Sequence, residues 1–177
     1  MKTAIWIVVS GIAAWAMLAC GGDMNASDTA PKVARTDIQQ GRYLVMVGGC
    51  NDCHTVGFAE SGGKAPAERE WLTGSPVGFN GPWGTSYASN LRLYVEQVSE
   101  DAWVTMCRTR EGLPPMPWPS LHNMDESDLR ALYRYLKDLG PAGRPAPTAV
   151  APGVEPATPY FVFVPQHLDR LGAAPSH

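Results

Sequence analysis

Cys50-Asn51-Asp52-Cys53-His54 is the stretch of sequence that decides the fold: two thiols three residues apart, followed at once by an imidazole. This spacing is typical of covalent c-type haem attachment. The two thiols add to the two vinyl groups of the porphyrin, and the adjacent histidine then lies under the iron and supplies an axial nitrogen. The motif therefore predicts one haem c, attached through Cys50 and Cys53, with His54 as an iron ligand.

A Cys-x-x-Cys pair also occurs in zinc sites and in thioredoxin-like redox motifs. A tetrahedral zinc site needs a second pair of ligands, and the other cysteines of the chain, Cys20 and Cys107, are isolated. A thioredoxin-like motif lies at a strand-to-helix junction in a βαβ pattern, and no such pattern surrounds Cys50. Haem attachment is therefore favoured, and a zinc or dithiol module without haem is the alternative.

The N-terminus has the profile of an export signal, because Lys2 precedes an uncharged, largely apolar stretch from Ala4 to Ala19. The residues around Cys20 resemble a bacterial lipoprotein cleavage box, in which the cysteine becomes the lipidated first residue. The alternatives are a plain cleaved secretory signal and an uncleaved anchor, which at this length barely spans a bilayer. We expect a signal peptide over residues 1–19, a lipidated tether over residues 20–35, and a protein anchored to a membrane in the periplasm.

Composition and charge fit one compact domain with extended ends. The 177 residues are 45% hydrophobic and 18% charged, with a formal net charge of -3, values that argue against disorder throughout. Lysine and arginine form no cluster, so a nucleic acid is not expected as a partner.

Three helices are predicted in the central part of the chain. The first begins with a capping box at Thr36 and delivers the haem motif at its end. The second covers residues 100–110, with Ser99 as its N-cap and two acids in its first turn. The third covers residues 126–139, with Asp125 as its cap and a stripe of leucines and tyrosines at helical spacing.

The remaining segments carry no pattern of alternating strands. Residues 55–90 are rich in glycine and are expected to form an irregular loop that covers the haem. The tail after Gly140 contains many prolines and should be extended. Its apolar run Tyr160–Val164 is expected to dock back onto the haem domain, because an exposed run of this kind is an aggregation liability. A strand that binds a partner is the rival interpretation.

A second iron ligand must come from elsewhere in the chain. Met116 is the best candidate, because prolines on both sides restrict the backbone of its loop. Met106 and Met124 fit the helix core better, and His122 would give a haem with two histidine ligands.

Three further residues have open assignments. Trp83 and Trp118 either pack on the porphyrin and bond a propionate through the indole N–H, or are plain core residues. Cys107 is expected to be an inert buried thiol, and a disulfide between Cys20 and Cys107 is the alternative.

Three segments resemble a known family. Gly41–Thr55 looks like the opening of class I cytochromes c, and is especially similar to the haem domains of bacterial membrane-associated dehydrogenase subunits. Gly81–Leu91 is similar to the loop that crosses the haem edge in those proteins, and Leu113–Pro119 resembles their methionine-ligand loop. The resemblance implies a small all-α fold with crossing first and last helices, one covalent haem, and electron transfer. Those subunits carry several haem motifs, whereas this chain has a single one.

The sequence thus predicts an all-α cytochrome c domain over residues 36–140, with few helices around one haem, followed by a proline-rich C-terminal extension over residues 141–177. The expected function is that of an exported monohaem cytochrome c, not itself an enzyme, which carries single electrons between a redox protein donor and an acceptor. The alternative is a haem enzyme or sensor whose open sixth position meets peroxide or a gas; no distal histidine–arginine pair is visible near the haem loops.

Overall fold

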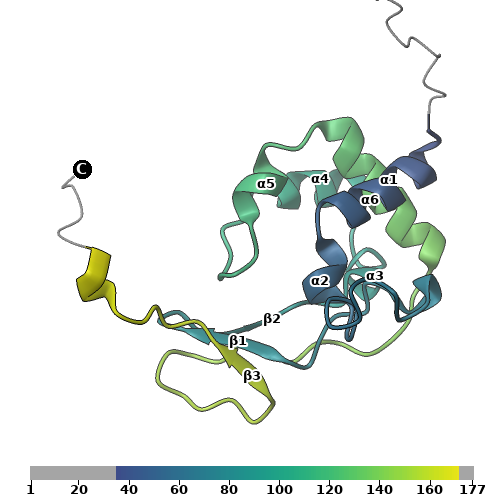
Figure 1. The fold of residues 1–177 in the computed structure, drawn as a ribbon. Helices are drawn as coiled ribbons and strands as arrows, with labels where there is room; N and C mark the ends of the chain where they lie inside the picture. Colours follow the sequence, from purple (N-terminus) through teal and green to yellow (C-terminus); the bar gives the residue numbers. More distant parts are fainter. Residues whose placement is uncertain (1–34, 172–177) are drawn as a thin grey trace, which may run out of the picture. The chain divides into compact units, whose positions relative to one another are not determined.

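The structure, a computed structural model, describes residues 35–171. The predicted signal peptide, Cys20 and all but the last residue of the predicted tether lie outside this range. Within it, the helices gather beside a small sheet (Figure 1). The helices are α1 (Asp37–Val47), α2 (Cys50–His54), α3 (Leu91–Tyr94), α4 (Glu100–Thr109), α5 (Trp118–His122) and α6 (Glu126–Leu139), with short 3-10 turns at η1 (Glu68–Glu70) and η2 (Leu168–Leu171).

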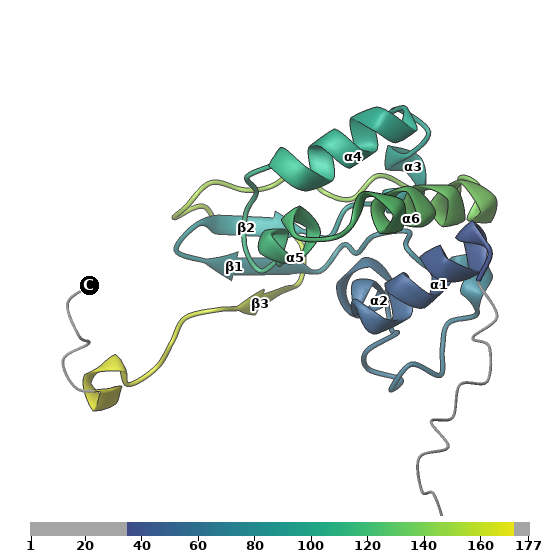
Figure 2. The same ribbon diagram turned by 90° about the horizontal axis from the view of Figure 1, so that it is seen from above.

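The prediction of an all-α fold is wrong, because the described residues also form a mixed three-stranded sheet. Strands β1 (Gly78–Gly81) and β2 (Gly84–Tyr87) make an antiparallel hairpin, and β3 (Tyr160–Val162) pairs with β1 in parallel. The order across the sheet is β2-β1-β3 (Figure 2). The expectation of an irregular loop over residues 55–90 fails over the hairpin. Its two strands are four residues long and begin or end in glycine, so they show no alternating pattern.

The predicted helices are confirmed. The N-terminus of α1 has the expected capping box, in which Thr36 Oγ1 accepts from the Gln39 amide at 3.3 Å and the Thr36 amide donates to Gln39 Oε1 at 3.0 Å. Ser99 caps α4 through a 3.2 Å bond from the amide of Ala102. Asp125 precedes α6 as expected, although its side chain makes no capping hydrogen bond.

The crossing of α1 and α6 that the resemblance implies is present, and it depends on Gly41. A Cβ built on Gly41 would lie 2.2 Å from the carbonyl oxygen of Ala131 and 2.6 Å from Cβ of Tyr135. Only a residue without a side chain allows the two backbones to approach this closely. The core around this crossing is apolar and comprises Val45, Phe58, Trp71, Leu72, Val95, Trp103, Val104, Cys107, Leu129, Leu132, Tyr135 and Leu136.

The tail docks back on the domain, as predicted, through its backbone. β3 pairs with β1, and beyond the strand the Phe163 amide donates to the carbonyl of Asn80 at 2.7 Å. The Phe79 and Phe161 rings stack at 5.9 Å. The side chains of the run nevertheless stay accessible, since Phe161 is 54% and Val162 is 64% exposed. No helix between residues 35 and 171 is both long and apolar enough to cross a membrane.

Candidate functional site

Helix α2 carries the predicted attachment motif from end to end. Gly49 precedes it with φ +65, a left-handed conformation that glycine adopts without strain, and so turns the chain out of α1. Residues three apart on a helix lie on the same side, so Cys50 and Cys53 share one face of this single short helix. His54 is the last residue of the helix, and its side chain is buried.

The ring of His54 is held in a defined orientation. Its Nδ1 lies 2.7 Å from the carbonyl oxygen of Ser89. Because a carbonyl oxygen only accepts, Nδ1 carries the proton, and the lone pair of the neutral ring is on Nε2. Burial lowers the pKa of His54, an effect that the bond to Ser89 partly offsets. A neutral imidazole whose other nitrogen is fixed by a carbonyl is the usual state of a metal-binding histidine.

The two thiols of α2 are free, and they lie in different surroundings. Cys50 packs against the core, and burial raises its pKa to about 11. Cys53 is partly exposed, and burial together with the neighbouring Asp52 raises its pKa. Reactive thioredoxin-like pairs have lowered pKa values, so this environment argues against the dithiol alternative. Within residues 35–171 no group of three or more His, Cys, Asp or Glu side chains is placed to hold a metal ion.

A buried hydrogen-bond network ties α2 to the loop that follows it. Thr55 Oγ1 donates to Asn51 Oδ1 at 2.7 Å and accepts from the Leu72 amide at 2.8 Å. The Gly74 amide donates to the carbonyl of His54 at 2.8 Å. Sequence reasoning did not identify Asn51 and Thr55 as supporting residues, because only the fold places residues 72–74 beside the helix.

Met116 lies in the loop before α5, which we call the methionine loop (residues 112–117). The side chain of Met116 is partly exposed, and the Trp118 amide donates to its carbonyl at 2.9 Å. Ser86 Oγ donates to the carbonyl of Pro114 and so attaches the loop to β2. In Figure 1 this loop extends from α5 toward the sheet.

The competing ligand candidates have other contacts. Met106 and Met124 pack against the hydrophobic core. His122 Nε2 lies 3.1 Å from the carbonyl oxygen of Arg110. Met116 therefore stays the predicted second ligand.

The two tryptophans differ in their hydrogen bonding. Trp83 Nε1 donates to the carbonyl of Phe79 at 3.2 Å, so this residue is satisfied within the sheet. Trp118 Nε1 is buried and has no hydrogen-bond partner within the described residues. Arg110 lies over the Trp118 ring, 5.4 Å from its centroid. A buried unpaired donor is costly, so Trp118 has an N–H available for an acceptor that a bound group would bring.

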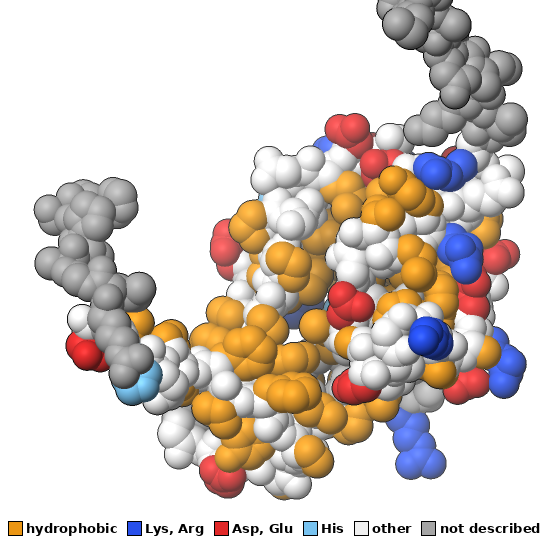
Figure 3. Space-filling model, viewed as in Figure 1, with side chains coloured by type: hydrophobic (Ala, Val, Ile, Leu, Met, Phe, Trp, Pro, Cys, Tyr) orange, Lys and Arg blue, Asp and Glu red, His pale blue; other side chains and the backbone are white. Residues whose placement is uncertain are grey.

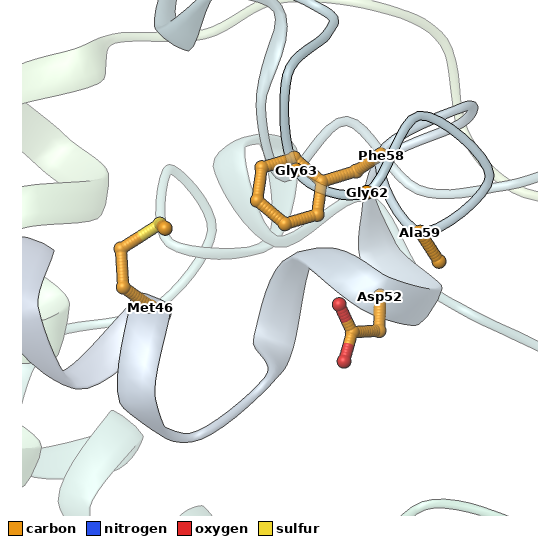
Figure 4. A pocket seen from close by; sticks show the side chains of 6 residues that line it. All are labelled: Met46, Asp52, Phe58, Ala59, Gly62 and Gly63. Carbon is orange, nitrogen blue, oxygen red and sulfur yellow. The ribbon is translucent and has the colours of Figure 1, made fainter.

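The surface of the described residues is hollowed in places. Figure 3 shows hydrophobic side chains gathered around a hollow between the helices and the sheet. A pocket of ≈ 500 Å³ is lined by Met46 of α1, by Asp52 of α2 and by Phe58, Ala59, Gly62 and Gly63 of the loop that follows α2 (Figure 4). Its lining includes none of the predicted haem ligands, so we do not assign the haem to it.

The residues present fit a covalent haem. Two free thiols share one face of α2, the adjacent neutral imidazole of His54 has its Nε2 lone pair available, and Trp118 has an unpaired buried donor. Each is a donor or an attachment point of the kind that such a group requires.

Comparison with known proteins gives a partial similarity. Over 120 residues the chain is 31% identical to a nicotinate dehydrogenase subunit of Pseudomonas putida, an alignment that covers 62% of this chain and 9% of that protein. The chain thus spans less than a tenth of the length of the relative that it matches. No family model matches the chain. No solved structure matches it significantly.

Proposed function

We propose that this chain is a monohaem c-type cytochrome that carries single electrons for a dehydrogenase. Cys50 and Cys53 would attach the haem, and His54 and Met116 would coordinate its iron. The observation that carries the proposal is the fixed ring of His54, buried at the end of a helix that also bears both free thiols, with Nδ1 bound to the Ser89 carbonyl at 2.7 Å.

The haem supplies one-electron chemistry when bound, and the chain sets the conditions for it. The Ser89 carbonyl holds the proton on Nδ1 of His54, which keeps Nε2 free as a donor. Burial disfavours the protonated imidazolium, so the donor stays neutral. The prolines around Met116 restrict the methionine loop. Met116 would then serve as a second protein ligand, and the iron would have no open position for a substrate.

The partial similarity supports a dehydrogenase as the partner. The matched protein of Pseudomonas putida is named as a subunit of nicotinate dehydrogenase, and part of it is similar to this chain. We propose that this chain is a non-catalytic subunit or an electron acceptor of such an oxidoreductase, and passes electrons on to a second redox protein. Because the chain covers 9% of the matched protein, the substrate of the relative is not carried over.

We further propose export to the periplasm and a lipid anchor on Cys20, from the apolar stretch and the small residues near it. Mass spectrometry of the mature N-terminus should find a diacylglyceryl group on Cys20. A mature chain that begins at another residue would reject the anchor.

Covalent attachment is tested by denaturing the purified protein and extracting it with acidified acetone. Colour should stay with the polypeptide of the wild type and of a Cys107→Ser control, and a Cys50→Ser/Cys53→Ser chain should release any colour that it holds. A colourless wild-type protein, produced in cells that attach haem to other c-type cytochromes, would reject the proposed function.

A further inference from the structure

Residues 84–90, which we call the spacer segment, contact both parts of the predicted haem site. Ser86 Oγ donates to the carbonyl of Pro114, in the methionine loop. The Ser89 carbonyl accepts from His54 Nδ1 at 2.7 Å. In an extended chain these two anchor points stand about 10 Å apart. The spacer segment therefore links the methionine loop to the histidine through one hydrogen bond at each.

The tail (residues 141–164) binds the same segment. Thr85 and Val150 exchange backbone hydrogen bonds, with the Thr85 amide 2.8 Å from the Val150 carbonyl and the Val150 amide 2.9 Å from the Thr85 carbonyl. The hydroxyl of Tyr87 lies 2.7 Å from Thr158 Oγ1. Each of these contacts joins a residue of the spacer segment to a residue far along the chain.

Neighbouring side chains of β2 bind different partners. The side chain of Ser86 binds the methionine loop, whereas that of Tyr87 binds the tail. Successive side chains of a strand point to opposite faces, so the strand lies between the methionine loop and the tail.

The tail also approaches both ends of the spacer segment. A Cβ on Gly84, which has φ +92, would lie 2.2 Å from the Val150 carbonyl oxygen, and Asn90 Nδ2 donates to the Ala142 carbonyl at 2.7 Å.

A second part of the tail lies near the attachment motif. Phe161, in β3, lines a small cavity together with Phe79 and Cys53. The tail thus binds the segment that contacts both the methionine loop and His54, and its Phe161 shares a small cavity with one of the two attachment thiols.

We propose that the tail is a clamp on the spacer segment, and that it controls how firmly Met116 closes the sixth position of the iron. The inference rests on the proposed function and adds a means of regulating the same site. Thr85, Tyr87, Val150 and Thr158 are positioning residues in this scheme, since they act through the segment that orients His54 and binds the methionine loop. Loosening the tail lets the methionine loop move away, while the haem stays attached through Cys50 and Cys53.

The test compares three full-length haem-loaded variants with the wild type. Tyr87→Phe removes the hydrogen bond to Thr158 and keeps the ring. Tyr160→Phe is the matched control, because its hydroxyl bonds Glu155 at 2.7 Å within the tail and does not touch the spacer segment. Val150→Pro removes the amide that donates to Thr85. The measurements are the sulfur-to-iron charge-transfer absorption of the ferric form and carbon monoxide binding to the ferrous form.

Tyr87→Phe should raise the fraction of ferrous protein open to carbon monoxide about fivefold, the change expected for the loss of one ordinary hydrogen bond. Val150→Pro should raise it further and weaken the charge-transfer absorption, while Tyr160→Phe matches the wild type. Haem content should be equal in all four proteins. Unchanged absorption and carbon monoxide resistance in both Tyr87→Phe and Val150→Pro would overturn the clamp and leave the proposed function intact. A wild-type protein without covalently attached haem would overturn both the clamp and the proposed function.

Discussion

At the scale of single residues, the site depends on which atom of His54 holds the proton. The carbonyl of Ser89 is 2.7 Å from Nδ1 and accepts from it. The same bond orients the ring and leaves the lone pair on Nε2. Because burial lowers the pKa of His54, the neutral form that binds a metal is also the form that the folded chain favours. Orientation and protonation state therefore come from the same surroundings.

Met116→Ala separates the electron carrier from the haem enzyme or sensor. If Met116 closes the sixth position, its loss should lower the reduction potential, abolish the sulfur-to-iron absorption and allow carbon monoxide to bind the ferrous haem. The wild type should resist carbon monoxide at neutral pH. Ready binding by the wild type would favour the enzyme or sensor, and an unchanged spectrum in the variant would move the ligand to His122 or Met124.

Labelling of Cys107 tests whether it is a free buried thiol or forms a disulfide with Cys20. It is fully buried, and burial raises its pKa to about 12, so below that pH the folded protein keeps it as an unreactive neutral thiol. The native haem-loaded protein should take up no iodoacetamide at pH 8, and the denatured protein should take up one label per chain, on Cys107. The denatured protein could instead take up no label without reductant and two labels after reduction. That result would indicate a disulfide between Cys20 and Cys107.

At the scale of elements, the helices could be predicted because their signals are local. The capping box at Thr36, the N-cap Ser99 and the apolar stripe of α6 act within one or two turns, and all three helices begin where these residues indicate. The sheet could not be predicted in the same way. β3 pairs in parallel with β1 from a position far along the chain, and nothing in Tyr160–Val162 encodes that partner.

A substitution at Gly41 tests how closely the backbones of α1 and α6 approach each other at their crossing. Gly41→Ala should destabilise the chain by about 1–3 kcal/mol despite the better helix propensity of alanine, because the added Cβ meets backbone that cannot move aside. Urea unfolding measures the loss. Val47→Ala, on the same helix with a side chain that is 60% exposed, is the control and should change stability far less. Equal stability of the wild type and Gly41→Ala would mean that the helices lie further apart.

At the scale of the whole molecule, the predicted site residues come from segments that only the fold connects. The motif itself identifies Cys50, Cys53 and His54, and proline flanks single out Met116, since these signals lie in neighbouring residues. The hydrogen bonds from His54 to Ser89 and from Ser86 to Pro114 join residues 35 and 28 positions apart. Such contacts have no local pattern. The sequence therefore predicts that the tail docks, but not that it binds the spacer segment or that this segment contacts His54 and the methionine loop.

The tail should therefore contribute to stability as well as to the site. A chain that ends after Arg144 keeps the carbonyls that bind Asn90 and Arg92 but loses Val150, Thr158 and β3. Its melting temperature should fall by about 5 °C or more, since several hydrogen bonds and the Phe79–Phe161 stack are lost together.

A chain that ends after Val164 keeps these contacts and should melt with the full-length protein, so the pair of truncations isolates the docked part of the tail. The side chains of Phe161 and Val162 stay exposed on β3. The same two truncated proteins therefore also test whether Tyr160–Val164 is a strand that binds a partner. The chain that ends after Arg144 could instead keep its melting temperature and lose binding to a dehydrogenase partner. That result would mean that β3 binds the partner and that its pairing with β1 adds little to the stability of the domain.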